Sequence, residues 1–470
     1  MEKNKDKKLG LSLLIALGVG SMIGGGIFNS PTDLIGKANP QSVIIAWVIG
    51  GLGVAFLALV FQLLANKRPE LTGGIFTYAK EGFGEFVGFN SAWGYWLSAW
   101  LGNVAFFILI FKTFNSLVGD VRPIVSFLLA SALLWIIHYI QMRGVKSAGI
   151  INAVATVAKL IPLLMVIVFG LIIFKSGTFN VDNWKTILAS TGDSTTVFSQ
   201  VKGAMGTILW CFIGIEAATV LSEKAKSQKI VGTATIISLI ITLVLYILVS
   251  TTAMGVISAS TLAGSQTPLA DMLSLTVLGS VGAVIVKVGL IISLIGCLIS
   301  WVMLAAEIPY VAAKGGTMPK WFIKQNDNGA AVNSLLLTDG LTQIFLLSLL
   351  LPALQSAYGN VFLISTTCIL IPYLLSSLYA VKVTFADSLG IKDKIVSILA
   401  CIYSLYVIYA VGINYLGAAI ILYAIGIFVY LKARKEKNEP IKTNEKIGMA
   451  VIIVVAILMI ILLSTGKIQL

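Results

Sequence analysis

The sequence predicts an all-α integral membrane protein. Of its 470 residues, 58% are hydrophobic and 11% are charged, whereas a soluble domain is about one quarter charged. The mean hydropathy is +0.97. The apolar residues fall in runs long enough to cross a hydrocarbon layer of about 30 Å. We therefore expect a chain that lies almost wholly within a bilayer, with no soluble domain.

The apolar runs divide the chain into twelve core spans and a thirteenth span at the C-terminal end. The eleventh and twelfth runs are separated by very few residues, which predicts a tight hairpin near Gly412. The expected spans are 11–36, 42–65, 86–117, 123–141, 148–174, 197–222, 230–258, 279–312, 333–352, 358–381, 394–412, 414–431 and 447–464.

Basic residues alternate between successive connections, and this predicts the orientation of the chain. Lysine and arginine cluster before span one and after spans two, four, six, eight, ten and twelve. The alternate connections carry few: Lys37, Lys112, Arg122, Lys175, Lys185 and Lys467. Positive residues mark the cytoplasmic ends of spans. We therefore expect a cytoplasmic N-terminus in the cell membrane. The net charge of +13 then faces anionic lipid and requires no nucleic acid.

The expected organisation follows from these spans. It comprises a cytoplasmic tail (1–10), a first repeat of spans one to five (11–174), an outer loop (175–196), a second repeat of spans six to ten (197–382), spans eleven and twelve (383–432), and a basic linker with span thirteen (433–470). The lysine-rich start does not predict a cleaved signal peptide, because the apolar run after it is too long and too rich in glycine.

Span one contains three consecutive glycines, Gly24, Gly25 and Gly26, at mid-depth. Glycine weakens a helix and exposes backbone polar groups. Within a bilayer such groups are tolerated only where they are buried in protein or line a cavity. A broken helix whose second half points its N-terminus at an anionic group is therefore expected here. The alternative is that the glycines only permit close helix packing.

Span six carries a second candidate break, five spans later. It contains Gly214 and an acidic residue, Glu216, deep in apolar sequence. Transporters built from two inverted repeats have discontinuous helices at equivalent places, and a five-plus-five repeat pairs span one with span six. For Gly214 alone, helix packing explains the glycine equally well. Glu216 is a candidate for gating or proton response, or simply an acid that caps the second half of the span.

Other polar and aromatic residues within spans form candidate pocket walls. Tyr95, Ala99 and Asn103 are spaced i, i+4, i+8 and share one helical face. Trp301 offers a π face to a cation, although a tryptophan in a membrane protein is often an interfacial anchor. Lys159 lies in the middle of span five, where a lysine is costly and suggests a function. The alternative for Lys159 is a side chain that snorkels to the surface.

Three segments together resemble the amino acid–polyamine–organocation superfamily. They are 20–31, 210–216 and 305–316. The resemblance covers spans one to twelve and is strongest to the basic amino acid/polyamine antiporter branch, in particular its arginine–ornithine antiporters. A thirteenth span suits that subgroup and departs from the twelve spans of arginine–agmatine antiporters. The resemblance implies a leucine-transporter-like fold of inverted five-helix repeats with helices one and six broken.

The resemblance also implies roles for individual residues. The unwound segment around Ile23 would bind the substrate, with its carboxylate on the amides of Gly24, Gly25 and Gly26. Arginine–agmatine antiporters have serine at the position of Gly25, so a hydroxyl contact is absent here. The remaining roles are carbonyls for the α-ammonium (Met22, Trp210 and Ile213), a lid (Trp210), a stacking surface for the head group (Trp301), a gate (Tyr95, Glu216 and Tyr373) and a pocket wall (Ala99 and Asn103).

For Lys159 the resemblance implies a fixed internal cation. Sodium-coupled members of the superfamily bind a cation between spans one, five and eight, and Lys159 matches that position. Its ammonium would then hold span five to the carbonyls of span one, although a proton-carrying role is the alternative. The single histidine, His138, receives no role, because no catalytic or metal-binding set accompanies it. No cofactor or metal is expected.

The expected function is exchange of a cationic amino acid for a related product, arginine for ornithine. Two other transport functions stay open, namely proton-coupled amino acid uptake and exchange of lysine or histidine for a diamine. A membrane enzyme or structural assembly protein is disfavoured, because the sequence contains no clustered catalytic set. The expected partners are small-molecule amino acids, membrane lipid and a second copy in a homodimer.

Overall fold

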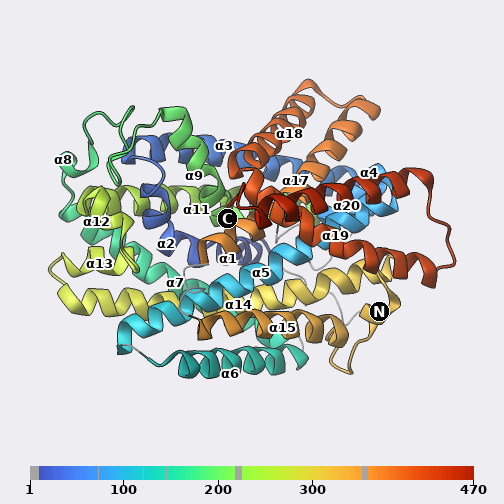
Figure 1. Cartoon of the computed structure of the whole chain (residues 1–470), viewed down its shortest axis with the longest axis horizontal. Helices are drawn as coiled ribbons and strands as arrows, with labels where there is room; N and C mark the ends of the chain where they lie inside the picture. Colours follow the sequence, from blue (N-terminus) through green and yellow to red (C-terminus); the bar gives the residue numbers. More distant parts are fainter. Residues whose placement is uncertain are drawn as a thin grey trace.

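A computed structural model describes residues 10–71, 74–119, 121–143, 145–216, 225–351 and 358–469, without the side chains of 145–158, 228 and 229. The expected tail 1–10 lies, except for Gly10, outside these residues. Long helices cross the molecule side by side and shorter ones cap their ends (Figure 1). The described part contains helices and two isolated β-bridges, so the predicted all-α class is confirmed.

The helices follow in this order: α1 (Leu11–Met22), α2 (Gly25–Ile35), α3 (Pro40–Lys67), α4 (Ile75–Phe83), α5 (Glu85–Val118), α6 (Pro123–Met142), α7 (Val145–Ile172), α8 (Ser176–Phe179), α9 (Val197–Phe212), α11 (Gln228–Val256), α12 (Ala259–Ala263), α13 (Pro268–Ser274), α14 (Gly279–Lys314), η3 (Lys320–Ile323), α15 (Val332–Leu346), η4 (Leu347–Leu350), α17 (Tyr358–Ala386), α18 (Ile391–Val411), α19 (Ile413–Glu436) and α20 (Thr443–Ser464).

Ten of the described helical segments are long and apolar enough to cross a membrane, and the bent pair α1–α2 makes an eleventh span. The two helices of this pair meet at 41°, as expected for the glycine-rich break. The two remaining expected spans contain α7 and α9. The chain is thus a multi-pass membrane protein, and the count of thirteen spans and the repeat symmetry stay predictions.

The connections between helices sort onto two opposite faces. One face, here called the basic face, carries the connections expected to be cytoplasmic. Arg68 pairs with Asp387 at 2.8 Å, which joins the ends of α3 and α17. Lys80 pairs with Glu85 at 3.0 Å and donates to the carbonyl of Gly315 at 2.8 Å. These contacts bring together the connections that follow expected spans two, eight and ten.

The opposite face, here called the loop face, carries connections 36–39, 173–196 and 257–278. Asn39 donates to the carbonyls of Trp184 and Ile187 at 2.9 and 2.7 Å. The C-terminal end reaches the same side as the α18–α19 hairpin, because Asn414 donates to the carbonyl of Gln469. The alternation of faces expected from the charge pattern is therefore present for these connections.

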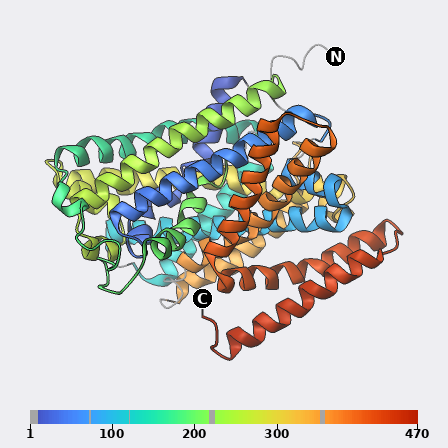
Figure 2. The same ribbon diagram turned by 90° about the horizontal axis from the view of Figure 1, so that it is seen from above.

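Burial separates the centre of the molecule from its periphery. In the most apolar window of α5, 89% of the residues are buried, against 17% for α20. Helices α19 and α20 form a hairpin along one edge of the bundle (Figure 2). Helix α5 is therefore the central element on which an internal site can be built, and α20 presents most of its surface to its surroundings.

A pocket between two helix breaks

The first break lies between α1 and α2. Helix α1 ends at Met22, and the amide of Ile23 donates to the carbonyl of Val19 at 2.9 Å. The amide of Gly24 donates to the carbonyl of Met22 at 2.8 Å. Helix α2 then starts at Gly25. Because the first amides of a helix have no acceptor within it, those of Gly25 and Gly26 remain available for a ligand.

The second break follows α9, which ends at Phe212. Gly214 has a φ of +109°, a value that favours glycine. A Cβ atom on Gly214 would lie 2.9 Å from the backbone of Ser21, whose hydroxyl donates to the carbonyl of Gly214 at 2.9 Å. The two breaks therefore pack directly against each other. The expected continuation of span six over 217–222 lies outside the described residues.

A tyrosine that the sequence analysis missed holds both breaks together. The hydroxyl of Tyr246, in α11, lies 2.8 Å from the carbonyl oxygen of Met22 and 2.9 Å from that of Cys211. The Met22 carbonyl also accepts from Gly24, so both of its lone pairs are engaged. The signal in the sequence was the single tyrosine within the expected span 230–258.

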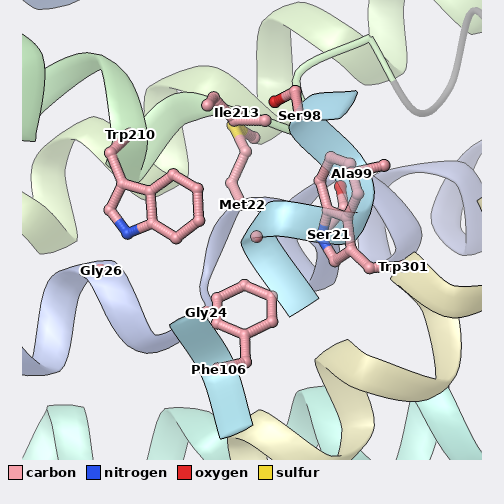
Figure 3. Close-up of a pocket in the computed structure, with 11 residues that line it drawn as sticks. Ser21, Met22, Gly24, Gly26, Ser98, Ala99, Phe106, Trp210, Ile213 and Trp301 are labelled. Carbon is pink, nitrogen blue, oxygen red and sulfur yellow. The ribbon is translucent and has the colours of Figure 1, made fainter. Parts of the chain in front are cut away.

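A small pocket lies between the breaks (Figure 3). Trp210 from α9 and Trp301 from α14 lie on opposite sides of it, with Phe106 from α5 below. Its volume is about 20 Å³, which is room for about one water molecule. The lining residues are Ser21, Met22, Gly24, Gly26, Ser98, Ala99, Gly102, Phe106, Trp210, Ile213 and Trp301.

Seven predicted binding residues line this pocket, and three do not. Those that line it are Met22, Gly24, Gly26, Ala99, Trp210, Ile213 and Trp301. Ile23 is fully buried and turns its carbonyl toward Lys159. A Cβ atom on Gly25 would meet the side chains of Leu109 and Leu294. Asn103 is fully buried, and neither polar atom of its side chain has a hydrogen-bond partner in the described protein.

Four lining residues were not predicted: Ser21, Ser98, Gly102 and Phe106. The last three are spaced four residues apart on α5. They form a face one position before the predicted face of Tyr95, Ala99 and Asn103. The predicted helical period was therefore right. Because Ala99 also lines the pocket, the side of α5 that faces the pocket lies between the two faces, which are about 100° apart.

Lys159 reaches the first break from α7. Its side chain is fully buried and donates to the carbonyls of Gly20 and Ile23 at 2.7 and 2.8 Å. A third contact, at 3.3 Å, is to the sulfur of Cys297 in α14. The ammonium therefore connects α7 and α14 to the carbonyls freed at the break, and it does not snorkel to a surface.

Glu216, Tyr373 and Tyr95 meet on the other side of the second break. The Tyr373 hydroxyl donates to Oε2 of Glu216 at 2.6 Å, and the Gly214 amide donates to the same oxygen at 3.1 Å. The second oxygen of Glu216 and the hydroxyl of Tyr95 are buried without a well-formed hydrogen bond, although Tyr95 interacts electrostatically with Glu216. The three residues predicted to form the gate, Tyr95, Glu216 and Tyr373, thus lie together.

Aromatic rings close the pocket toward the loop face. The Trp210 ring lies 5.7 Å from that of Phe106 and 5.6 Å from that of Phe362, measured between centroids. The Phe362 ring lies 5.2 Å from that of Tyr358. Trp210 is thus the centre of an aromatic layer, here called the ring layer. His138, for which no role was expected, pairs away from the pocket with Asp339 of α15 at 2.7 Å.

Comparison with known proteins gives the family. Residues 9–457 match the sequence profile described as "Amino acid permease". An arginine/ornithine antiporter from Pseudomonas aeruginosa is 41% identical over 472 residues, which cover 97% of both chains. A putative arginine/ornithine antiporter from Escherichia coli is 39% identical over 95% of this chain and 97% of its own. An arginine/ornithine antiporter from Latilactobacillus sakei is 37% identical over 99% of both chains.

These matches cover nearly the whole chain and agree with a multi-pass helical membrane structure. The predicted resemblance is therefore confirmed. This chain belongs to the amino acid permease family of the amino acid–polyamine–organocation superfamily, whose members transport small-molecule amino acids and are not enzymes.

Proposed function

We propose that this protein exchanges arginine for ornithine across the cell membrane by alternating access. The observation that carries the proposal is the pocket itself, which is lined both by Gly24 and Gly26 at the start of α2 and by Trp301. The relatives described as arginine/ornithine antiporters support the same substrate pair. Both substrates carry one α-carboxylate, one α-ammonium and a cationic side chain, so one pocket serves both.

Each group of the substrate has a complementary partner in the proposed complex. The carboxylate accepts from the amides of Gly25 and Gly26, at the positive end of α2. The α-ammonium donates to carbonyls at the second break, at Ile213 and Trp210, because the Met22 carbonyl is already engaged. The cationic head group lies over the ring of Trp301, a contact of about 2 kcal/mol when desolvated.

The pocket must enlarge before it accepts an amino acid. Its volume of about 20 Å³ is far below that of arginine. The ring layer covers it toward the loop face, and the Glu216–Tyr373 hydrogen bond covers it on the other side. We assign Trp210 to the outer gate and Tyr95, Glu216 and Tyr373 to the inner gate. Alternating access then opens one cover while the other stays closed.

Lys159 explains exchange without ion coupling. Its ammonium donates hydrogen bonds to the carbonyls of Gly20 and Ile23. Such carbonyls are the kind of ligand that a sodium ion would otherwise use. We therefore favour a structural cation over a proton carrier, and pure exchange over proton-coupled uptake. In the proposed orientation the basic face is cytoplasmic, and the chain forms two inverted five-helix repeats. A homodimer remains a prediction that native mass spectrometry tests.

A counterflow experiment tests the substrate assignment. Purified protein is reconstituted in liposomes, which are preloaded with unlabelled arginine and diluted into labelled ornithine without any ion gradient. We expect rapid accumulation of ornithine, competed by external arginine but weakly by lysine, histidine, agmatine and cadaverine. Preferred exchange of lysine or histidine for its diamine would replace the proposed substrate pair with the alternative one.

A further inference from the structure

A second, larger cavity opens at the loop face. Its volume is about 490 Å³, far larger than that of the central pocket. It lies between α2, α5, the start of α6, the α12–α13 connection and the start of α17, and we call it the outer cavity. Exposed residues at Gly264 and Gln266 mark its mouth. Thr32 of α2 donates to the carbonyls of Leu262 and Ser265, which fixes this rim.

The outer cavity lies on the route to the central pocket. On α2, Gly26 lines the pocket and Asn29 lines the outer cavity, a rise of about 4.5 Å for three helical residues. On α5, Phe106 lines the pocket and Ile108 the outer cavity. The ring layer borders both spaces, because Trp210 and Phe106 line the central pocket and Tyr358 lines the outer cavity. A substrate that passes Trp210 therefore enters or leaves through the outer cavity.

Buried oxygen atoms in this cavity lack donors. Asn29 is 4% exposed, and its Nδ2 donates to Oδ1 of Asp33 at 2.9 Å. Oδ1 of Asn29 and Oδ2 of Asp33 are both buried without a hydrogen-bond partner in the described protein. The hydroxyl of Tyr358, a residue 4% exposed, makes no well-formed hydrogen bond, although it interacts with the indole of Trp210. Buried polar atoms are normally satisfied, so this set calls for a ligand rich in hydrogen-bond donors.

The cavity lining carries one charge of each sign. Asp33 supplies a carboxylate, and Lys112, half-buried on α5, supplies an ammonium. Neither makes an ion pair within 4.0 Å among the described residues. The Asp33 carboxylate and the Lys112 ammonium attract each other over a longer distance. Opposite charges held apart in one cavity complement a molecule that has a cation at one end and a carboxylate at the other.

We propose that the outer cavity is a transient binding site for a cationic amino acid, in which Asp33, Asn29 and Tyr358 accept from the side-chain cation and Lys112 binds the α-carboxylate. This inference rests on the proposed function, since it assigns the same substrate class to a second site. Its volume of about 490 Å³ admits an amino acid while the central pocket is closed. The site captures substrate before the ring layer opens.

Side-dependent kinetics of the full-length chain test this assignment. Labelled arginine uptake is measured in right-side-out and inside-out vesicles preloaded with ornithine. Asp33→Asn keeps an oxygen to accept from Asn29 and removes the charge. We expect the KM from the loop-face side to rise about tenfold, as for loss of a charge-assisted hydrogen bond. The kcat, and the KM from the other side, should stay within about twofold.

Lys112→Gln provides an independent second variant. The half-buried side chain of Lys112 makes no hydrogen bond or ion pair among the described residues, so its replacement should not affect folding. It should raise the KM for arginine from the loop-face side. In Lys112→Gln, inhibition by external agmatine should stay unchanged, because agmatine has the guanidinium but no carboxylate. Asp33→Asn should weaken both the uptake of arginine from the loop-face side and the inhibition by agmatine. Asp182→Asn removes an exposed acid on the same face and should match the wild type.

The outcomes separate the two proposals. If the wild type exchanges arginine for ornithine and both cavity variants keep its KM from both sides, the outer site is overturned and the proposed function stands. Equal KM increases from both sides also overturn the outer site, because they indicate a general defect in transport. If the wild type exchanges no cationic amino acid, the proposed function and the outer site fail together.

Discussion

The ammonium nitrogen of Lys159 lies 2.8 Å from the carbonyl oxygen of Ile23. This contact joins the middle of α7 to the residue that follows the end of α1. Because it also engages Gly20, the lysine satisfies two of the backbone groups that the break leaves exposed. The shape of the central pocket therefore depends on a side chain that does not line it.

Lys159→Ala should abolish transport while the protein remains in the membrane. Each freed carbonyl left unpaired costs on the order of 1–3 kcal/mol, which destabilises the unwound segment. Lys159→Gln keeps a donor without charge and should retain part of the exchange if the role is structural. Transport assays of purified variants in vesicles provide the measurement, with the exposed Lys324→Ala as control. Full activity of Lys159→Ala would refute both the structural and the proton-carrying role.

Trp301→Leu should weaken arginine binding far more than it affects folding. The substitution removes the π face and keeps apolar bulk, so a loss of about 2 kcal/mol, or roughly thirtyfold in Kd, is expected. Titration calorimetry of the detergent-purified protein measures this change. Trp321→Leu, at an exposed tryptophan of η3, is the matched control. Unchanged arginine affinity in Trp301→Leu would exclude the stacking role.

Gly214→Ala should destabilise the protein and slow exchange. The residue has a φ of +109°, and the added Cβ would lie 2.9 Å from the Ser21 backbone. A strained backbone of this kind costs about 1–3 kcal/mol. Thermal unfolding monitored by fluorescence checks the effect. Gly340→Ala, where an added Cβ meets nothing within 4 Å, should leave Tm nearly unchanged. Equal Tm values for both variants would contradict close packing of the two breaks.

The C-terminus should be accessible from outside the cell. Gln469 contacts Asn414 at the α18–α19 hairpin, on the face that the charge pattern places opposite the cytoplasm. An impermeant maleimide should therefore label Gln469→Cys in intact cells but label Lys435→Cys only after permeabilisation. Labelling of Gln469→Cys only after permeabilisation would refute the span count or the orientation.

The sequence was sufficient to predict the class of fold and the position of its breaks. Glycine runs and a lone acid within apolar spans are costly, so Gly24, Gly214 and Glu216 already indicated where regular helix ends. The cost of a lysine at mid-span marked Lys159 as a candidate, whereas its place at the carbonyls of span one was implied only by the family resemblance. The ends of α1 and α9 were predictable because a helix break within a bilayer has a local free-energy cost that marks the sequence.

The details of the pocket depended on tertiary packing and were less predictable. The rotation of α5 about its axis places Ser98 and Phe106 in the lining and leaves Asn103 outside it. The bridge from Tyr246 to Met22 joins residues 224 positions apart. The amide of Gly24 is used within the break itself. No pattern within one helix determines such contacts, because they arise from how neighbouring helices meet.

Obligatory exchange of arginine for ornithine is tested most directly by dual-label efflux. Vesicles containing the purified protein are loaded with labelled arginine, the membrane potential is clamped, and external ornithine carries a second label. We predict negligible arginine efflux without ornithine, efflux matched to ornithine entry when it is present, and no response to an imposed proton gradient. Arginine efflux without an exchange partner, or uptake driven by the proton gradient alone, would contradict the account.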